Sequence, residues 1–195
     1  MVSDELAGGG DGARRLLVVD APNVDRVHAG LLGRPPLRTE RFDPEALTAW
    51  MDGASKSRAE RTLFTNVRQP VPAGVEGWIR HLVDAGWKVF AKPKLRPGDD
   101  IDDEMVAHLT SAEWTQVTVF SHDSACFVDP LMALAASGCV VTVLGFRECA
   151  GNLPHLDGID YVDVASVPGL YQSLPPRVRL VDLRPQGSWV EPVAN

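Results

Sequence analysis

Short apolar runs alternate with amphipathic stretches along most of the chain. Runs that are apolar on both sides suit strands buried on both faces of a parallel sheet. The predicted strands cover residues 16–20, 61–67, 87–93, 116–121 and 139–146, with a short sixth at 159–164.

Helical periodicity fills the intervals between these strands. Asp43 before Pro44 is typical of a helix start, with the aspartate as N-cap. Further helices are predicted at residues 72–85, 101–111 and 129–137, the first of them ended by Gly86. Alternating strands and helices predict an α/β fold with a mainly parallel sheet and right-handed crossovers.

The two ends of the chain differ from its middle. The length of 195 residues fits one domain with an appendage. Residues 1–13 are Gly-rich and polar, and we expect them to be disordered. Residues 168–195 are Pro-rich and lack a helical period. We expect them to form an extended arm packed on a domain of residues 14–167, and its predicted anchors are Val178, Leu180, Leu183 and Trp189.

Charge and cysteine content narrow the class of protein. Nineteen basic and 26 acidic residues give a net charge of −7, which argues against a broad basic surface that binds nucleic acid by charge alone. No apolar run reaches membrane length, and the N-terminus has no secretion-signal pattern. Three cysteines without a CxxC pair indicate reduced thiols and exclude a zinc finger. We therefore expect a cytoplasmic protein that does not enter a membrane.

Acidic residues recur where predicted strands end. Asp20 ends the first strand, Asp102 and Asp103 follow the third, and Asp123 follows the fourth. Ligands of an open parallel sheet bind outside the carboxyl ends of its strands. If the first and fourth strands are neighbours, Asp20 and Asp123 face each other across a crevice, and the helix near Ile101 can bring Asp102 or Asp103 to the same place.

A cluster of carboxylates without bases resists ionisation because its members repel one another. A divalent cation removes that cost. Oxygen ligands without Cys or His select Mg²⁺ or Mn²⁺ over zinc, and these ions meet substrates through phosphate oxygens. The pattern thus indicates phosphoryl-transfer chemistry, with hydrolysis of a phosphodiester as the leading case.

Each acid also has a purely structural interpretation. A single Asp after a strand is more often a helix N-cap or a turn former than a ligand. Asp99 and Asp100, beside Gly98, are interpreted as turn formers, and Asp123 as a possible cap. His122 is interpreted as a surface or turn residue, because no Ser/His/Asp spacing supports a hydrolase triad.

Polar neighbours of the acids complete the candidate site. Asn23 can form an Asx turn or hold a metal-bound water, and Ser121 can hydrogen-bond a carboxylate or a phosphate. Lys92 and Lys94 can guide a phosphate backbone toward the metal, or they form an ordinary solvated loop. Arg34 can contribute to the same basic stretch.

Three ordered motifs resemble those of NYN-domain ribonucleases, a branch of the PIN-like nuclease superfamily. They are VVDAPNV, DDIDDEMVAHL and VTVFSHDSACFVDPLMALAASGCVVTVLGF, and the resemblance covers residues 15–165. It implies a PIN-like three-layer αβα sandwich, Mg²⁺ or Mn²⁺ in an acidic pocket, and cleavage of RNA. The positions that match the family's acidic and polar sites are Asp20, Asn23, Asp102, Asp103 and Asp123.

The chain departs from that family after Asp123. The family often has a further Asp a few residues on, where this chain has Ala125 and Cys126 and its next acid is Asp129.

Two hypotheses about the function follow. The first is a metal-dependent endoribonuclease acting on single-stranded RNA, with a homodimer left open as its assembly state. The second is a catalytically degenerate module that binds RNA or a protein partner without cleavage. Receiver-like or phosphatase chemistry is disfavoured, because no convincing Thr and Lys stand at later strand ends.

In the ribonuclease hypothesis each polar residue has its own role. Asp20, Asp102 and Asp123 ligate the metal directly. Asp103 ligates a second metal or orients the attacking water. Asn23 does not bind the metal and instead fixes the geometry of the residues that do.

Overall fold

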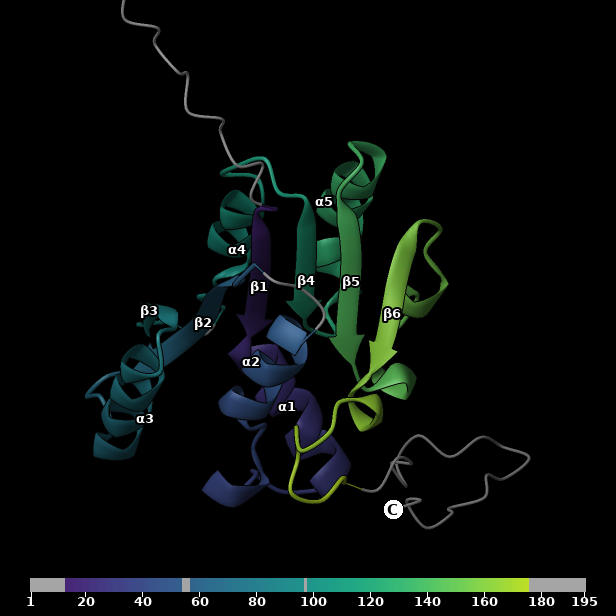
Figure 1. The fold of residues 1–195 in the computed structure, drawn as a ribbon. Helices are drawn as coiled ribbons and strands as arrows, with labels where there is room; N and C mark the ends of the chain where they lie inside the picture. Colours follow the sequence, from purple (N-terminus) through teal and green to yellow (C-terminus); the bar gives the residue numbers. More distant parts are fainter. Residues whose placement is uncertain (1–12, 54–56, 97, 176–195) are drawn as a thin grey trace, which may run out of the picture.

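A six-stranded parallel sheet forms the centre of the protein (Figure 1). The computed structural model describes residues 13–53, 57–96 and 98–175, so the N-terminal segment and the predicted anchors of the arm lie outside the described residues. The strand order β3-β2-β1-β4-β5-β6 confirms the prediction of an α/β fold. The strands are β1 (Arg15–Asp20), β2 (Glu60–Arg68), β3 (Lys88–Lys94), β4 (Gln116–Phe120), β5 (Val140–Gly145) and β6 (Ile159–Asp163).

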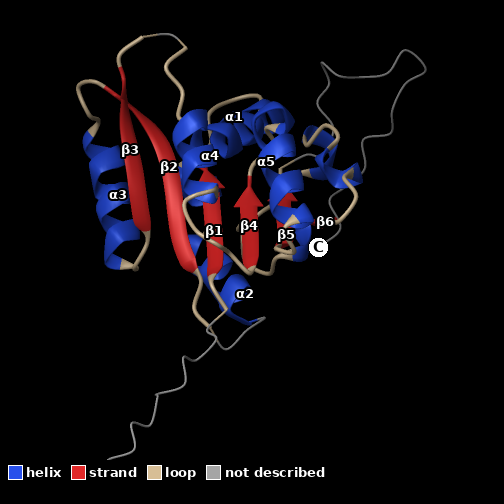
Figure 2. Cartoon of the chain, turned by 90° about the horizontal axis from the view of Figure 1, so that it is seen from above, coloured by secondary structure: helices blue, strands red, loops and turns tan. Residues whose placement is uncertain are grey.

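Helices cover both faces of this sheet and make it the middle of three layers (Figure 2). One hydrophobic cluster joins α1, α2 and α3 to one face, and a second joins α4 and α5 to the other. None of the described helices is long and apolar enough to cross a membrane. The helices are α1 (Ala21–Leu32), α2 (Pro44–Gly53), α3 (Ala73–Asp84), α4 (Asp102–Leu109) and α5 (Ser124–Ala136).

Strand β1 belongs to both cores because its side chains alternate between the two faces. Leu17 and Val19 enter the cluster below α1, whereas Leu16 and Val18 enter the cluster below α4 and α5. All four are fully buried, as expected for a central strand of a covered parallel sheet. The continuous apolar run of the sequence therefore marks the middle of the sheet.

The order in which the chain adds strands to the sheet changes direction between β1 and β4. From β1 it builds outward to β2 and β3, returns through α4 to β4, and then builds outward to β5 and β6. β1 and β4 pair directly, with Val19 opposite Phe120. The first and fourth strands are thus neighbours, which is the condition for Asp20 and Asp123 to meet. Crevices of this kind, outside the carboxyl ends of the strands, are where open α/β sheets bind ligands.

Two helix starts differ from the sequence prediction. The sequence predicted no helix directly after the first strand, but α1 begins at Ala21, where the Asp20 side chain accepts the Asn23 N–H. α5 begins at Ser124 rather than at residue 129, because Asp123 caps it by accepting two backbone N–H groups. Asp20 both ends β1 and caps α1, so no loop separates the two elements, whereas a short segment of residues 121–123 lies between β4 and α5.

Gly145 lies in the tightest glycine environment at the carboxyl end of β5. A Cβ atom there would lie 2.7 Å from the Tyr161 hydroxyl and 3.0 Å from the His122 ring. Gly77, inside α3, has no atom within 4 Å of its corresponding position. The two glycines form a matched pair for testing the packing of this strand end.

We expect Gly145→Ala to lower the free energy of unfolding by about 1–3 kcal/mol, because overpacking forces the neighbouring rings to move. Gly77→Ala should instead raise it by about 0.5–1 kcal/mol, because alanine restricts the unfolded chain and suits a helix interior. Urea denaturation of both variants measures the difference. Equal stability of Gly145→Ala and the wild type would contradict the described packing.

Candidate functional site

A pocket of about 360 Å³ opens at the carboxyl edge of the sheet, beside the β1–β4 switch point. We refer to it as the acidic pocket. Its lining comes from the starts of α1, α4 and α5, from the ends of β2 and β3, and from the turn before α4. The lining residues are Asp20, Pro22, Asn23, Arg26, Asn66, Lys94, Gly98, Asp99, Asp100, Ile101, Asp102 and Asp123.

Asp20 is the most buried carboxylate of the acidic pocket, with 3% of the residue exposed. Its Oδ1 accepts the Asn23 N–H at 3.1 Å, and its Oδ2 accepts the Ser121 hydroxyl at 2.9 Å. Burial raises the pKa of Asp20 to about 6, against the lowering effect of these two hydrogen bonds. The charges of Asp102 and Asp123 make a smaller contribution to the same rise.

Asp102 and Asp123 bring two more carboxylates to the same pocket from separate elements. Asp102 is the first residue of α4, and its pKa is raised by burial and by the charges of Asp100 and Asp123. Asp123 caps α5 through Oδ1, which accepts the N–H groups of Ala125 and Cys126. Among the described residues, no Lys or Arg forms an ion pair within 4.0 Å of Asp20, Asp102 or Asp123.

A buried hydrogen-bond network holds Asp20 and Asp123 in register. The Ser121 hydroxyl donates to Asp20 and accepts the Asp123 N–H at 3.1 Å. Asn23 Oδ1 accepts the backbone N–H of His122 at 2.9 Å. Ser121, which is fully buried, thus acts from behind the pocket wall, whereas Asn23 is part of the lining. The end of β1 and the segment after β4 are joined by side chains on both sides.

His122 continues this network to β5. Its Nε2 accepts the Phe146 N–H at 2.8 Å, so Nε2 is unprotonated. The proton of the neutral ring is then on Nδ1, which lies 3.1 Å from Asn23 Oδ1 and donates to it. The ring also stacks on Phe146 with an interplanar angle of 12°.

The interpretation of His122 as a surface or turn residue was wrong. The residue is 6% exposed, and burial lowers the pKa of its ring to about 4. A neutral ring suits a position where one ring nitrogen must accept and the other must donate. His122 therefore positions the pocket-lining Asn23 and the end of β5, and it does not itself line the pocket.

The other predicted residues divide between the pocket and its surroundings. Lys94 lines the pocket, whereas Lys92 Nζ bonds Glu104 Oε1 at 2.6 Å. Asp103 is exposed in the first turn of α4 and does not line the pocket. Asp129, the next acid after Asp123, is exposed on α5 and is also absent from the lining.

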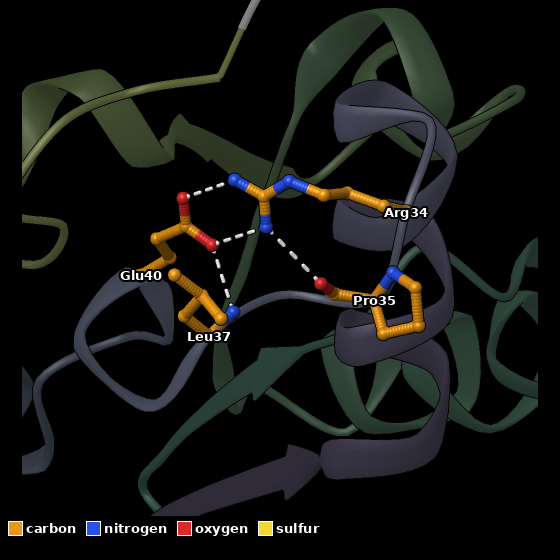
Figure 3. A network of polar contacts seen from close by, with 4 residues as sticks. All are labelled: Arg34, Pro35, Leu37 and Glu40. Atoms are coloured by element: carbon orange, nitrogen blue, oxygen red, sulfur yellow. Dashed lines mark hydrogen bonds and ion pairs between the residues drawn. The ribbon is translucent and has the colours of Figure 1, made fainter.

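Arg34 is engaged outside the acidic pocket. Its guanidinium forms two hydrogen bonds with Glu40, at 2.7 and 2.6 Å, and Glu40 also accepts the Leu37 N–H (Figure 3). The bond from Arg34 holds the pKa of Glu40 at about 2. This cluster closes the connection between α1 and α2, which is a structural role.

The sequence prediction missed Arg26 and Asn66 and assigned Asp99 to a turn alone. Arg26 lies on α1, which the sequence did not predict, so nothing indicated that it faces the pocket. Asn66 is near the end of β2 and donates to the Asp99 carbonyl at 3.3 Å. Asp99 does form the turn, accepting the N–H groups of Leu95 and Arg96, but it also lines the pocket.

The donor chemistry of the acidic pocket bears on which ion it can accept. Among the described residues, no group of three or more His, Cys, Asp or Glu side chains is placed so that it could hold a metal ion. Mg²⁺ and similar ions keep several waters and are often bound by only one or two carboxylates. The carboxylate and amide oxygens of this lining are the donor type that Mg²⁺ and Mn²⁺ prefer, and the lining contains no Cys or His of the kind that zinc prefers.

Comparison with known proteins gives a fold and no activity. No family model matches the chain, and no curated protein does. The chain is similar to the crystal structure of a protein of unknown function from Vibrio parahaemolyticus RIMD 2210633, with a TM-score of 0.56 and 15% sequence identity. The match covers 80% of this chain and 96% of that one. At this identity the similarity concerns the fold alone.

We expect Asp20→Asn to stabilise the metal-free protein at neutral and alkaline pH. The native pKa of Asp20, about 6, exceeds the unperturbed value of 3.8, so its contribution to stability is full below 3.8 and lost as the pH rises through about 6. Asparagine keeps the helix cap and carries no charge. The gain should grow with pH to the order of 2–3 kcal/mol.

Urea denaturation in EDTA from about pH 5 to about pH 8 measures this difference. Asp129→Asn is the matched control, because that side chain is exposed and outside the acidic pocket. A gain that does not depend on pH would show that Asp20 ionises without cost.

Proposed function

We propose that this protein is a metal-dependent ribonuclease that hydrolyses RNA phosphodiesters at the acidic pocket. One observation carries the proposal. Asp20, Asp102 and Asp123, from three separate elements, line one pocket without an ion-paired Lys or Arg among the described residues. Burial, and to a smaller extent the charges of neighbouring carboxylates, raise the pKa of Asp20 and of Asp102, and a divalent cation removes this cost of ionisation.

The three carboxylates would hold Mg²⁺ or Mn²⁺, largely through its water shell. Bound there, the ion supplies positive charge that polarises the phosphate and acidifies a water. Ser121 and Asn23 fix the orientation of Asp20 through its two oxygens. A carboxylate held in this way keeps its position when the substrate arrives, which lowers the cost of reaching the reactive geometry.

Arg26 and Lys94 supply the cationic part of the same pocket. Both line it, and both are exposed. A phosphodiester that meets the carboxylates would therefore also meet a guanidinium and an ammonium, which bind phosphate oxygens. Arg26 also lowers the pKa of Asp102 slightly against its other neighbours. The choice of RNA over other phosphodiesters rests on the resemblance of the three sequence motifs to NYN-domain ribonucleases.

A module that binds RNA without cleaving it is the second candidate. Two observations favour it: Ala125 and Cys126 stand where the family often has a further acid, and the described residues contain no group of three metal ligands. Asp129 does not substitute for that acid, because it is exposed and outside the pocket. The two candidates differ in whether the carboxylates are needed for turnover.

The ribonuclease proposal predicts cleavage of single-stranded RNA with Mn²⁺ or Mg²⁺ and none in EDTA. Asp20→Asn, Asp102→Asn and Asp123→Asn should each lower kcat/KM at least about a hundredfold, since each removes a charge that holds the ion. Asp103→Asn should have a smaller effect, and Asp129→Asn none. Gel analysis of a labelled RNA measures these rates. Activity unchanged in Asp20→Asn and Asp123→Asn would refute the proposal.

Metal binding can be tested without any substrate. Mn²⁺ at concentrations well above its Kd should raise the Tm of the wild type, because a ligand of the native state alone stabilises that state by mass action. At one hundred times Kd the gain is about 2.7 kcal/mol. Asp123→Asn should largely abolish the shift, and Asp129→Asn should retain it. An unchanged wild-type Tm would favour the non-cleaving module.

A further inference from the structure

On the side of the sheet opposite α3, the described helices leave much of the edge strand β3 uncovered. α4 packs on Phe64 of β2 and on β1, and α5 stands over the strands beyond it (Figure 2). Every second side chain of the two strands points to this open side. We define the β2–β3 face by Phe64 and Asn66 on β2 and by Lys88, Phe90, Lys92 and Lys94 on β3.

Two phenylalanines form the centre of the β2–β3 face. Phe64 is buried and Phe90 is 42% exposed, and their ring centroids are 5.4 Å apart. A hollow of about 510 Å³ lies against them and is closed on one side by α4. An exposed ring beside a hollow of this kind offers a flat apolar surface on which an unpaired base can stack.

Two polar residues of α4, Glu104 and His108, line the same hollow. Glu104 Oε1 accepts a hydrogen bond from Lys92, and His108 Nε2 lies 3.6 Å from Glu60 Oε1. Glu104 Oε2 and His108 Nε2 are themselves buried, so a base in this hollow would gain from the stack on the exposed Phe90 ring rather than from these two atoms.

Three lysines flank the aromatic centre along β3. Lys88, Lys92 and Lys94 occupy alternate or near-alternate positions of the strand on the side of Phe90. Lys88 pairs with Glu60 at 2.9 Å, and Lys92 pairs with Glu104 at 2.6 Å. Such partly exposed pairs contribute only about 0–1 kcal/mol, so a phosphate can replace the carboxylate at small cost.

The β2–β3 face leads directly into the acidic pocket. Asn66 and Lys94 belong to the face and also line the pocket. From Phe90 to Lys94 the strand advances about 13 Å, so a bound base and the carboxylates lie within a short stretch of one nucleic-acid strand. The β2–β3 face carries three lysines, whereas the whole chain has a net charge of −7. Electrostatic attraction of RNA is therefore expected at this face and not over the whole surface.

We infer that single-stranded RNA binds along the β2–β3 face, with an unpaired base stacked on Phe90 and its phosphates along the lysines toward the acidic pocket. The inference rests on the proposed function for its direction, since the scissile phosphate is placed at the carboxylates. Beyond the proposed function, the inference specifies the path of the RNA, the requirement for an unpaired base and the residue on which that base stacks. A duplex does not satisfy this arrangement, because its bases are already stacked and paired.

Binding is measured separately from cleavage. A fluorescent single-stranded RNA is titrated with the full chain in EDTA, and anisotropy gives Kd. Phe90→Ala should raise Kd about five- to a hundredfold, the range expected for loss of one base–aromatic stack. Phe90→Tyr should bind as the wild type does. Val83→Ala, an exposed apolar residue of α3 that packs on the opposite side of the sheet, should leave Kd unchanged.

The contribution of the lysines is measured through the salt dependence of RNA binding. Lys94→Gln should weaken binding of all sequences alike and reduce the slope of log Kd against log salt by about one. Arg80→Gln is the matched control, because Arg80 is 70% exposed on α3 and lies outside the β2–β3 face. A duplex of the same length should bind more weakly than the single strand.

The outcomes separate this inference from the proposed function. Binding that depends on Phe90 in a protein that never cleaves RNA supports the inference and refutes the nuclease. Cleavage with a KM that Phe90→Ala leaves unchanged supports the nuclease and overturns the inference. Absence of single-strand binding by the wild type also overturns it. So does a sedimentation shift showing that Phe90→Ala disrupts self-association without affecting RNA, since the face then contacts another copy of the chain.

Discussion

The hydrogen-bonded junction between the ends of β1 and β4 is the constraint on which the rest of the site depends. Asp20 accepts the Ser121 hydroxyl, and Asn23 accepts the backbone N–H of His122. These bonds join β1 to the segment after β4 at the point where the strand order of the sheet changes direction. The helices that follow, α1 and α5, therefore both start at one crevice. Without them, the buried Asp20 carboxylate would have lost water without gaining partners, which is far more costly.

The junction also explains why this edge of the sheet holds negative charge. Asp20 and Asp123 cap α1 and α5, and helix N-termini favour a carboxylate. The capping interpretation and the ligand interpretation of these acids are compatible, because a carboxylate has about four acceptor sites, of which Asp20 uses one on each oxygen and Asp123 uses Oδ1 for the cap. A neutral His122 extends the support to β5 without adding a positive charge beneath the carboxylates.

Much of the fold could be predicted from the sequence because buried strands are short and apolar. The run at residues 16–20 predicted the central strand, and the acids at strand ends predicted the edge that carries the acidic pocket. The helix after Asp20 could not be predicted, since one aspartate ends the strand and begins the helix with no intervening loop. Arg26 was missed for the same reason. The burial of His122 depends on Phe146, which is 24 residues away and which no local pattern connects to it.

Asp123 contributes to both folding and the acidic pocket through the same side chain. Asparagine is as good a helix cap as aspartate but carries no charge. A single-base change in the codon would therefore remove this charge from the pocket and leave the start of α5 intact. If the proposed ribonuclease activity depends on that charge, it can be lost without any loss of folding.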